Sequence, residues 1–131
     1  MAIPNVGGGY QVADGNTSEL SMVVRPQATV ISAAYTLTAA DFAAGIISAT
    51  SSGSYALTTP TGAQMDAAFT NAKVGSSFDL SLTHGSAINV ITLTAGATDV
   101  TIVGLATVTG VTSGTWTFRK TGVATWSAYR I

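Results

Sequence analysis

The chain has no cysteine and very little charge. Only 8% of its 131 residues are charged, with five lysines and arginines against six acids and a formal net charge of −1. The absence of cysteine excludes disulfides and thiol chemistry, and so small a basic content argues against nucleic-acid binding. No apolar run approaches the length of a membrane-spanning helix. We therefore expect neither nucleic acid nor a membrane as a partner.

Histidine and clustered acids, from which catalytic and metal sites are built, are equally scarce. His84 is the one histidine, and we interpret it as a surface or cross-strand residue beside a turn. A lone histidine in a chain without cysteine cannot complete a zinc site. The acids form no paired-carboxylate motif; they are Asp14, Glu19, Asp41, Asp66, Asp79 and Asp99. We expect no enzyme, no cofactor and no metal.

Small hydroxyl residues take the place of charge. The sequence contains 21 threonines and 13 serines, and 47% of its residues are hydrophobic, many of them alanine. Small soluble monomers usually carry mixed surface charge, whereas the cores of protein interfaces are depleted in charge. The composition therefore favours a protein that lives in an assembly. The alternative interpretation is a secreted or pilus-type β domain, which can have the same composition.

The first nineteen residues differ from the rest of the chain. The stretch "NVGGGYQVADGNTSE" combines three glycines with a turn signal and carries a single aromatic residue, Tyr10. It offers too few apolar side chains for a core of its own. We predict a flexible, extended N-terminal arm over residues 1–19 and, from the chain length, a single β-rich domain over residues 20–131.

A first short helix is predicted over Ala39–Ala44. Thr38 and Asp41 stand at the spacing of a capping box, in which the fourth residue is more often glutamate. Gly45 follows at the position where a helix commonly ends. One helical turn therefore separates two strand-like stretches.

A second helix is predicted over Gly62–Asn71. Thr61 is its N-cap, and Gln64 stands three residues later as the partner in a capping box. The helical spacing of its apolar residues, Met65, Ala68, Phe69 and Ala72, gives one apolar face.

The remaining sequence reads as short strands. The first are expected at Leu20–Val24 and Ala28–Tyr35. After Gly75 the chain reads as a meander, in which "SSFDLSLTH" alternates apolar and polar side chains. Strands of five to nine residues with short turns predict a mainly β fold. We expect an antiparallel β-sandwich or barrel, jelly-roll-like, with the helices at an end or edge.

The last stretch, "TWTFRKTGVATWSAYRI", gathers both tryptophans and three of the five cations. We interpret it as a terminal β-hairpin that turns at Thr121-Gly122, with Trp116 and Phe118 packed in the core. Four aromatic residues and one cation are our candidates for subunit or capsid contacts. They are Tyr10, Tyr35, Trp126, Tyr129 and Arg130.

Two stretches carry a resemblance to a known family. They begin "LTAADFAAGIISATSSGSYALTTPTGAQMDAAFTNAKVGSSFDLSLTH" and "TLTAGATDVTIVGLATVTGVTSGTWTFRK", and together they cover most of residues 37–131. "PTGAQMDAAF" and "VGSSFDLSLTH" are their most specific parts. The pattern resembles a domain of tailed-bacteriophage virion proteins. That resemblance implies a β-rich structural module without catalytic residues, found as a capsid decoration (cement) protein and within spikes and fibres.

The resemblance and the composition together predict a structural virion protein. We expect it to decorate and stabilise the assembled capsid from the exterior, after synthesis in the host cytoplasm. Its expected partners are the major capsid protein and further copies of itself. Because threefold positions are available on a capsid, the expected oligomer is a homotrimer. The alternative is a fibre, spike or tail-associated receptor-binding module.

Overall fold

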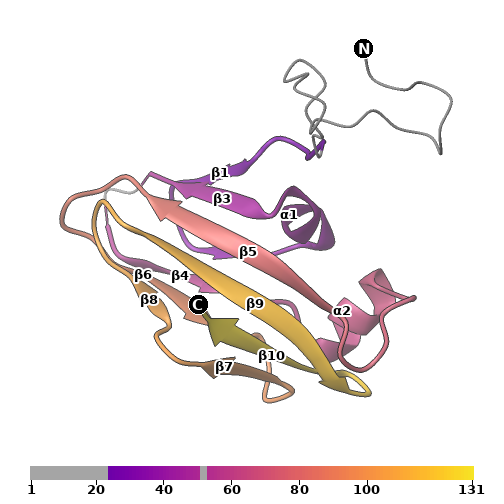
Figure 1. Cartoon of the computed structure of the whole chain (residues 1–131). Helices are drawn as coiled ribbons and strands as arrows, with labels where there is room; N and C mark the ends of the chain where they lie inside the picture. The colour runs from indigo at the N-terminus through magenta and orange to yellow at the C-terminus, as the bar shows by residue number, and fades with distance from the viewer. Residues whose placement is uncertain (1–23, 51–52) are drawn as a thin grey trace, which may run out of the picture.

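The structure, a computed structural model, describes residues 24–50 and 53–131 (Figure 1). The predicted arm, residues 1–19, lies outside the described residues. So does all of the predicted strand Leu20–Val24 except its last residue, which belongs to no strand.

The described residues form ten strands and two short helices, in a mainly β fold. The strands are β1 (Thr29–Ile31), β2 (Tyr35–Thr36), β3 (Ile46–Ala49), β4 (Tyr55–Thr58), β5 (Ser77–His84), β6 (Ile91–Thr94), β7 (Val100–Val103), β8 (Thr107–Val108), β9 (Ser113–Gly122) and β10 (Thr125–Arg130). The helices are α1 (Ala39–Ala44) and α2 (Gly62–Ala68).

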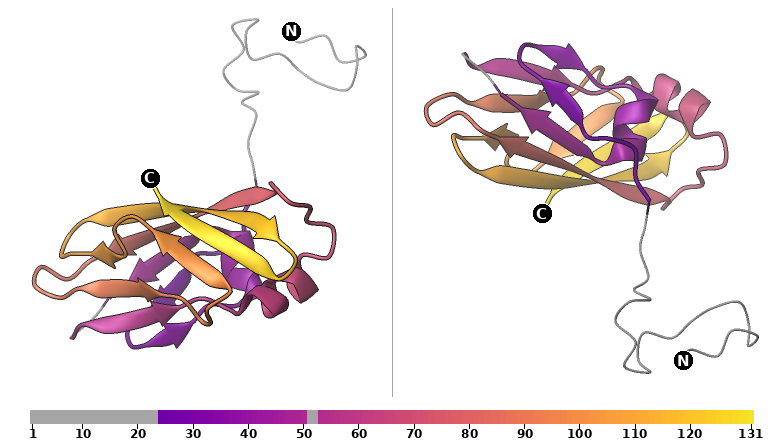
Figure 2. Two further views of the ribbon diagram at one scale, coloured as in Figure 1. Left: turned by 90° about the horizontal axis from the view of Figure 1, so that it is seen from below. Right: turned by 90° about the horizontal axis from the view of Figure 1, so that it is seen from above.

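The strands lie in two facing sheets, and the chain changes sheet at almost every step. One sheet has six strands in the order β1-β3-β5-β9-β10-β7, and the other has four in the order β2-β4-β6-β8. Figure 2 shows the two layers from opposite sides. From β1 to β9 every strand lies in the other sheet from the strand before it, and only β9 and β10 follow each other within one sheet.

Because the chain alternates between the two sheets, strands that are neighbours in one sheet are separated in sequence by a strand of the other sheet, and many of them run parallel. Within β1 to β6, the pairs β1–β3, β3–β5, β2–β4 and β4–β6 are all parallel. We call these six strands the wound region. By contrast β9 and β10, which we call the terminal hairpin, pair antiparallel, and β9 also pairs antiparallel with β5.

The predicted antiparallel pairing was wrong, because both sheets are mixed. Of the two architectures that we expected, the structure has the sandwich-like one and does not close into a barrel. The stretch after Gly75 is not a meander, because β5 to β8 alternate between the sheets. A strand with one apolar face packs equally well in either layer, and a short loop can lead to the facing sheet as well as to the neighbouring strand.

The predicted strand Ala28–Tyr35 is in fact two strands in different sheets. The chain bends after Ile31, and β1 and β2 pair with β3 and β4 respectively. Since both halves of the stretch are small and apolar, the sequence carried no clear turn signal at the bend.

Both helices lie in connections that lead from the four-stranded to the six-stranded sheet, so they close the same end of the sandwich (Figure 1). The prediction of α1 over Ala39–Ala44 is confirmed, with Gly45 in the left-handed conformation at its end. The second helix is confirmed with its capping box of Thr61 and Gln64, but it ends at Ala68 rather than Asn71. Neither helix in the described part of the chain is long and apolar enough to cross a membrane.

One apolar core fills the space between the sheets. Leu57, Ile91 and Leu93 enter it from the four-stranded sheet, and Trp116 and Phe118 from the terminal hairpin. Each of these side chains is at most 2% exposed. The prediction that Trp116 and Phe118 are core residues is confirmed.

Two details near the ends of β5 and β9 differ from expectation. His84 lies opposite Ala49 on β3, as a cross-strand residue, but it is 4% exposed and not on the surface. The hairpin turns at Val123-Ala124 rather than at Thr121-Gly122, which still belong to β9. Ala124 takes the positive φ of 52° that the tight turn requires, a conformation that glycine adopts more readily.

Candidate contact surfaces

The five predicted contact residues do not form one surface. Tyr10 lies outside the described residues. Trp126 is 1% exposed, so its indole is not available to a partner, and any contact made by the hairpin must use other side chains. Tyr35, Tyr129 and Arg130 are half-buried. Tyr35 lies on β2 in the four-stranded sheet, whereas Tyr129 and Arg130 are neighbours on β10 whose side chains point to opposite sides of the six-stranded sheet.

Trp126 belongs to an aromatic cluster at the helical end of the core. Its ring lies 6.1 Å from that of Phe69 and 5.8 Å from that of Phe78, and Phe78 stacks on Phe118 at 5.6 Å. Aromatic pairs at such separations add to the stability that burial alone provides. Trp126 thus packs inside the domain and connects α2 to the terminal hairpin.

Asp66 on α2 fixes this connection. Its carboxylate accepts hydrogen bonds from the backbone N–H of Ala124 at 2.8 Å and from Nε1 of Trp126 at 2.9 Å, and it pairs with Nζ of Lys120 at 3.0 Å. The backbone hydrogen bond from Ala124, followed by those from Trp126 and Lys120, holds the pKa of Asp66 below its ordinary value. This carboxylate therefore has a structural role in the described part of the chain.

The side chain of Arg130 also makes contacts within the domain. Its guanidinium lies 4.9 Å from the ring centre of Trp116, and its Nη1 donates to the carbonyl oxygens of Leu105 at 3.2 Å and Thr107 at 2.9 Å. A cation over an indole is a favourable contact. Arg130 thereby links β10 to the β7–β8 connection, and only part of its side chain is left for a partner.

Tyr35 is one of the donors around a buried acid. Asp41 is 3% exposed, and it accepts from the hydroxyls of Thr29 at 2.5 Å and Tyr35 at 3.0 Å and from the backbone N–H of Thr38 at 2.7 Å. Burial alone would raise the pKa of Asp41, but these hydrogen bonds outweigh it and hold the pKa below 3.8. The network joins α1 to β1 and β2.

Tyr129 lies on a face that sequence reasoning missed, the outer side of the six-stranded sheet. We call this the hydroxyl face, because serines and threonines dominate it. Its residues alternate along each strand with the core residues, and no described helix packs on it. They are Val30, Ile46, Ser48, Asp79, Ser81, Thr83, Ser113, Thr115, Thr117, Arg119, Tyr129, Thr101 and Val103. The alternation of hydroxyl residues in β5 and β9 was the signal that could have revealed it.

The polar groups of the hydroxyl face partly satisfy one another. Ser81 and Thr115 lie opposite each other with their hydroxyl oxygens 2.9 Å apart, and the Thr117 hydroxyl donates to Asp79 at 2.6 Å. Apolar side chains stand among them, with Val30 64% exposed and Val103 43% exposed. Since paired hydroxyls lose little when water is removed, this face can pack against protein at a low desolvation cost.

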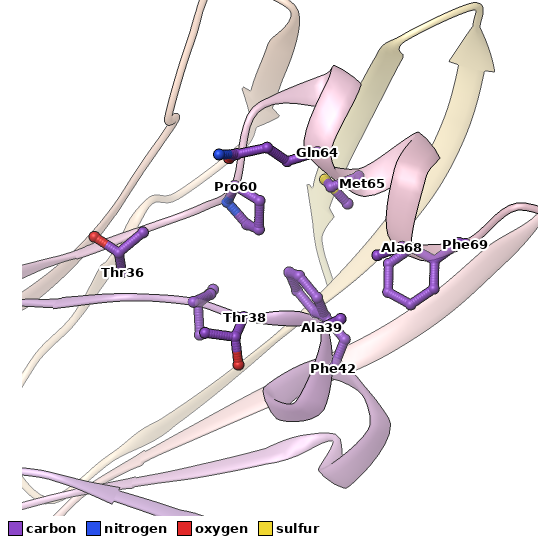
Figure 3. A pocket seen from close by; sticks show the side chains of 10 residues that line it. Thr36, Thr38, Ala39, Phe42, Pro60, Gln64, Met65, Ala68 and Phe69 are labelled. Atoms are coloured by element: carbon purple, nitrogen blue, oxygen red, sulfur yellow. The ribbon is translucent and has the colours of Figure 1, made fainter.

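A pocket lies elsewhere, at the helical end of the sandwich. It has a volume of about 430 Å³, and Figure 3 shows α2 on one side of it and the β2–α1 segment on the other. No charged side chain lines it. Its lining consists of Thr36, Leu37, Thr38, Ala39, Phe42, Pro60, Gln64, Met65, Ala68 and Phe69.

Another pocket, of about 360 Å³, lies at the opposite end of β5 and includes His84. Its other described lining residues are small or apolar, and none is an acid that could orient the imidazole as a catalytic base. Within residues 24–50 and 53–131, no group of three or more His, Asp or Glu side chains is placed to hold a metal ion.

Comparison with known proteins adds nothing to this geometry: no family model, no curated protein and no solved structure matches the chain. The chemistry of its surfaces is thus the basis for a functional proposal.

Proposed function

We propose that this chain is a structural virion protein of a tailed bacteriophage, which decorates the exterior of the assembled capsid and stabilises it by binding the lattice of the major capsid protein. The observation that carries the proposal is the hydroxyl face. Among the described residues, no helix packs on this face of the six-stranded sheet, and its charged side chains are Asp79 and Arg119. The sequence resemblance to virion modules points the same way.

The stabilising mechanism is mass action. A protein that binds the assembled shell, and not its separated subunits, shifts the equilibrium toward the shell. Each 100 Å² of apolar surface buried contributes about 2.5 kcal/mol, and a shell repeats that contact many times. Homotrimers seated at threefold positions would multiply the effect further, because each trimer contacts several capsid subunits at once.

The test uses particles that lack this protein. We expect them to assemble but to lose their integrity at a lower temperature than complete particles, and added protein should restore the difference in a saturable way. Unchanged heat stability, with the protein located at the tail tip, would instead support the receptor-binding alternative.

A matched pair of variants locates the contact. Tyr129→Arg places a charge on the hydroxyl face and should abolish the protection. Thr92→Arg places the same charge on the outer side of the four-stranded sheet, where Thr92 lies between buried Ile91 and Leu93, and should retain it. The reverse result would assign the capsid contact to the four-stranded sheet.

A further inference from the structure

The 430 Å³ pocket between α2 and the β2–α1 segment shares no lining residue with the hydroxyl face. Its floor is apolar and well ordered by packing, since Leu37, Phe42 and Met65 are 2%, 6% and 1% exposed. The Phe42 and Phe69 rings lie 6.0 Å apart in an edge-to-face arrangement. A pocket of this size is large enough for a small ligand or for an aromatic side chain with its neighbours.

The rim of the pocket defines the chemistry of its ligand. Thr36, Thr38 and Gln64 are exposed there (Figure 3). The Gln64 carbonyl oxygen accepts from the backbone N–H of Thr61 at 2.9 Å, which leaves the amide N–H groups as donors. With no charged side chain in the lining, the pocket disfavours an ionic ligand. An uncharged aromatic ring with one hydroxyl fits both the floor and the rim.

The described chain begins close to this pocket. Val24 is 95% exposed, and the guanidinium of the next residue, Arg25, lies against Gly45 at the end of α1. The pocket lies at the beginning of the same helix, with Thr38 and Ala39 in its lining. A six-residue helix is only about 9 Å long, so the point that the Arg25 side chain reaches is about one helix length from the pocket lining.

We propose that this pocket binds the side chain of Tyr10 from the N-terminal segment of the same chain. Tyr10 is the one aromatic residue among residues 1–23, and it combines the ring and the hydroxyl that the pocket suits. The fourteen-residue step from Tyr10 to Val24 spans about 20 Å as a flexible chain and up to about 46 Å when extended. The three glycines before Tyr10 permit close approach of the backbone.

Attachment to the same chain favours this occupant over a second copy. A linker whose average length matches the distance between two sites gives an effective concentration in the millimolar range, on the order of 1 mM. Insertion of the ring is then substantially populated if its intrinsic dissociation constant is near or below that concentration. This inference is independent of the proposed capsid function, because it concerns a contact within the free subunit.

Cysteine crosslinking in the full-length chain tests the proposal, since the natural sequence contains no cysteine. Gln11→Cys with Ala68→Cys places one thiol beside Tyr10 and the other in the pocket lining. We expect an intramolecular disulfide that forms about tenfold faster or more than in the control pair Gln11→Cys with Ala67→Cys. Ala67 is exposed on the same helix but does not line the pocket. Tyr10→Ala added to the first pair should remove the advantage.

Equal rates for the two pairs, no effect of Tyr10→Ala, or disulfides that join two chains would each overturn the proposal. A thermal cycle supplies a second measurement. Tyr10→Ala and Ala68→Arg should each lower Tm by about 3–6 °C, the double variant should lower it no further, and Ala67→Arg should have no such effect. Additive shifts would show that Tyr10 and the pocket do not interact.

Discussion

The wound region and the terminal hairpin pair their strands in different ways. In the wound region Ile47 on β3 lies opposite Leu82 on β5, 35 residues later in the sequence, and the strands are parallel. In the terminal hairpin Phe118 lies opposite Ala128, ten residues later, and the strands are antiparallel. The hairpin closes a short loop, whereas the wound region must close several long ones before its contacts form. Both regions nevertheless contribute to one core.

The prediction with the largest expected change in stability tests whether the wound region and the terminal hairpin unfold together. Phe118→Ala in the hairpin should destabilise the protein by about 3–5 kcal/mol, and Leu57→Ala in the wound region by about 2–5 kcal/mol, because each empties a fully buried site. Chemical denaturation followed by tryptophan fluorescence and by circular dichroism should show one coincident transition for each variant. Two separate transitions would mean that the regions are independent.

The next effect concerns the junction between α2 and the hairpin. A Cβ atom at Gly62 would lie 1.9 Å from the carbonyl oxygen of Ala124, a backbone atom that cannot move aside cheaply. We expect Gly62→Ala to cost up to about 3 kcal/mol in the free energy of unfolding. Gly53→Ala is the matched control, since nothing lies near a Cβ atom there and little change is expected. Equal stability of the two variants would contradict the close packing of α2 on the hairpin turn.

A smaller effect depends on pH and compares one acid from each region. The pKa values of Asp41, beside the wound region, and Asp66, at the hairpin, both lie below 3.8 in the folded protein. A depressed carboxyl pKa stabilises the fold above the unfolded pKa, and this stabilisation is lost as the pH falls through the folded value. Stability should therefore decline below about pH 3.8.

Replacing each of these two aspartates by asparagine tests whether they cause the loss of stability at acid pH. Asp41→Asn should cost about 1–2 kcal/mol at neutral pH, because an amide group then faces the donors from Thr29, Thr38 and Tyr35. Asp66→Asn should also lower stability, and both variants should show a flatter dependence on acid pH in thermal melts. If the loss of stability at acid pH is the same in both variants as in the natural protein, other groups cause the decline.

The smallest expected effect is an increase in stability from a substitution at the hairpin turn. Ala124 has a φ of 52°, which costs a non-glycine residue roughly 1–2 kcal/mol, while glycine loses up to about 1 kcal/mol more in backbone entropy on folding. Ala124→Gly should therefore raise stability by less than about 1 kcal/mol, measured as a small increase in the denaturation midpoint. A decrease would indicate that the methyl group of Ala124 supports the turn.

Local signals in the sequence predicted the local structure. The Thr38–Asp41 and Thr61–Gln64 spacings identified both helix starts, and the alternation in "SSFDLSLTH" identified β5. These features depend on residues close together in the chain, where capping and side-chain periodicity act directly.

The partners of the strands were not predictable in the same way. A strand such as Ile91–Thr94 presents the same apolar face whether it joins the sheet of its predecessor or the facing sheet. The contacts of Trp126 and Arg130 also could not be read from the local sequence. Trp126 donates to Asp66, and Arg130 donates to the carbonyl oxygen of Leu105, and both partners are far away in the chain. Local pattern specifies a strand, whereas packing of the whole chain selects its partner.

The most direct test of the proposed function is the number of copies of this protein on purified virions, measured by quantitative mass spectrometry against the major capsid protein. A decoration protein that covers the shell should be present in a fixed ratio to the major capsid protein, close to one copy per capsid subunit or per lattice position. A few copies per particle, or none, would contradict the capsid role and assign the hydroxyl face to another partner.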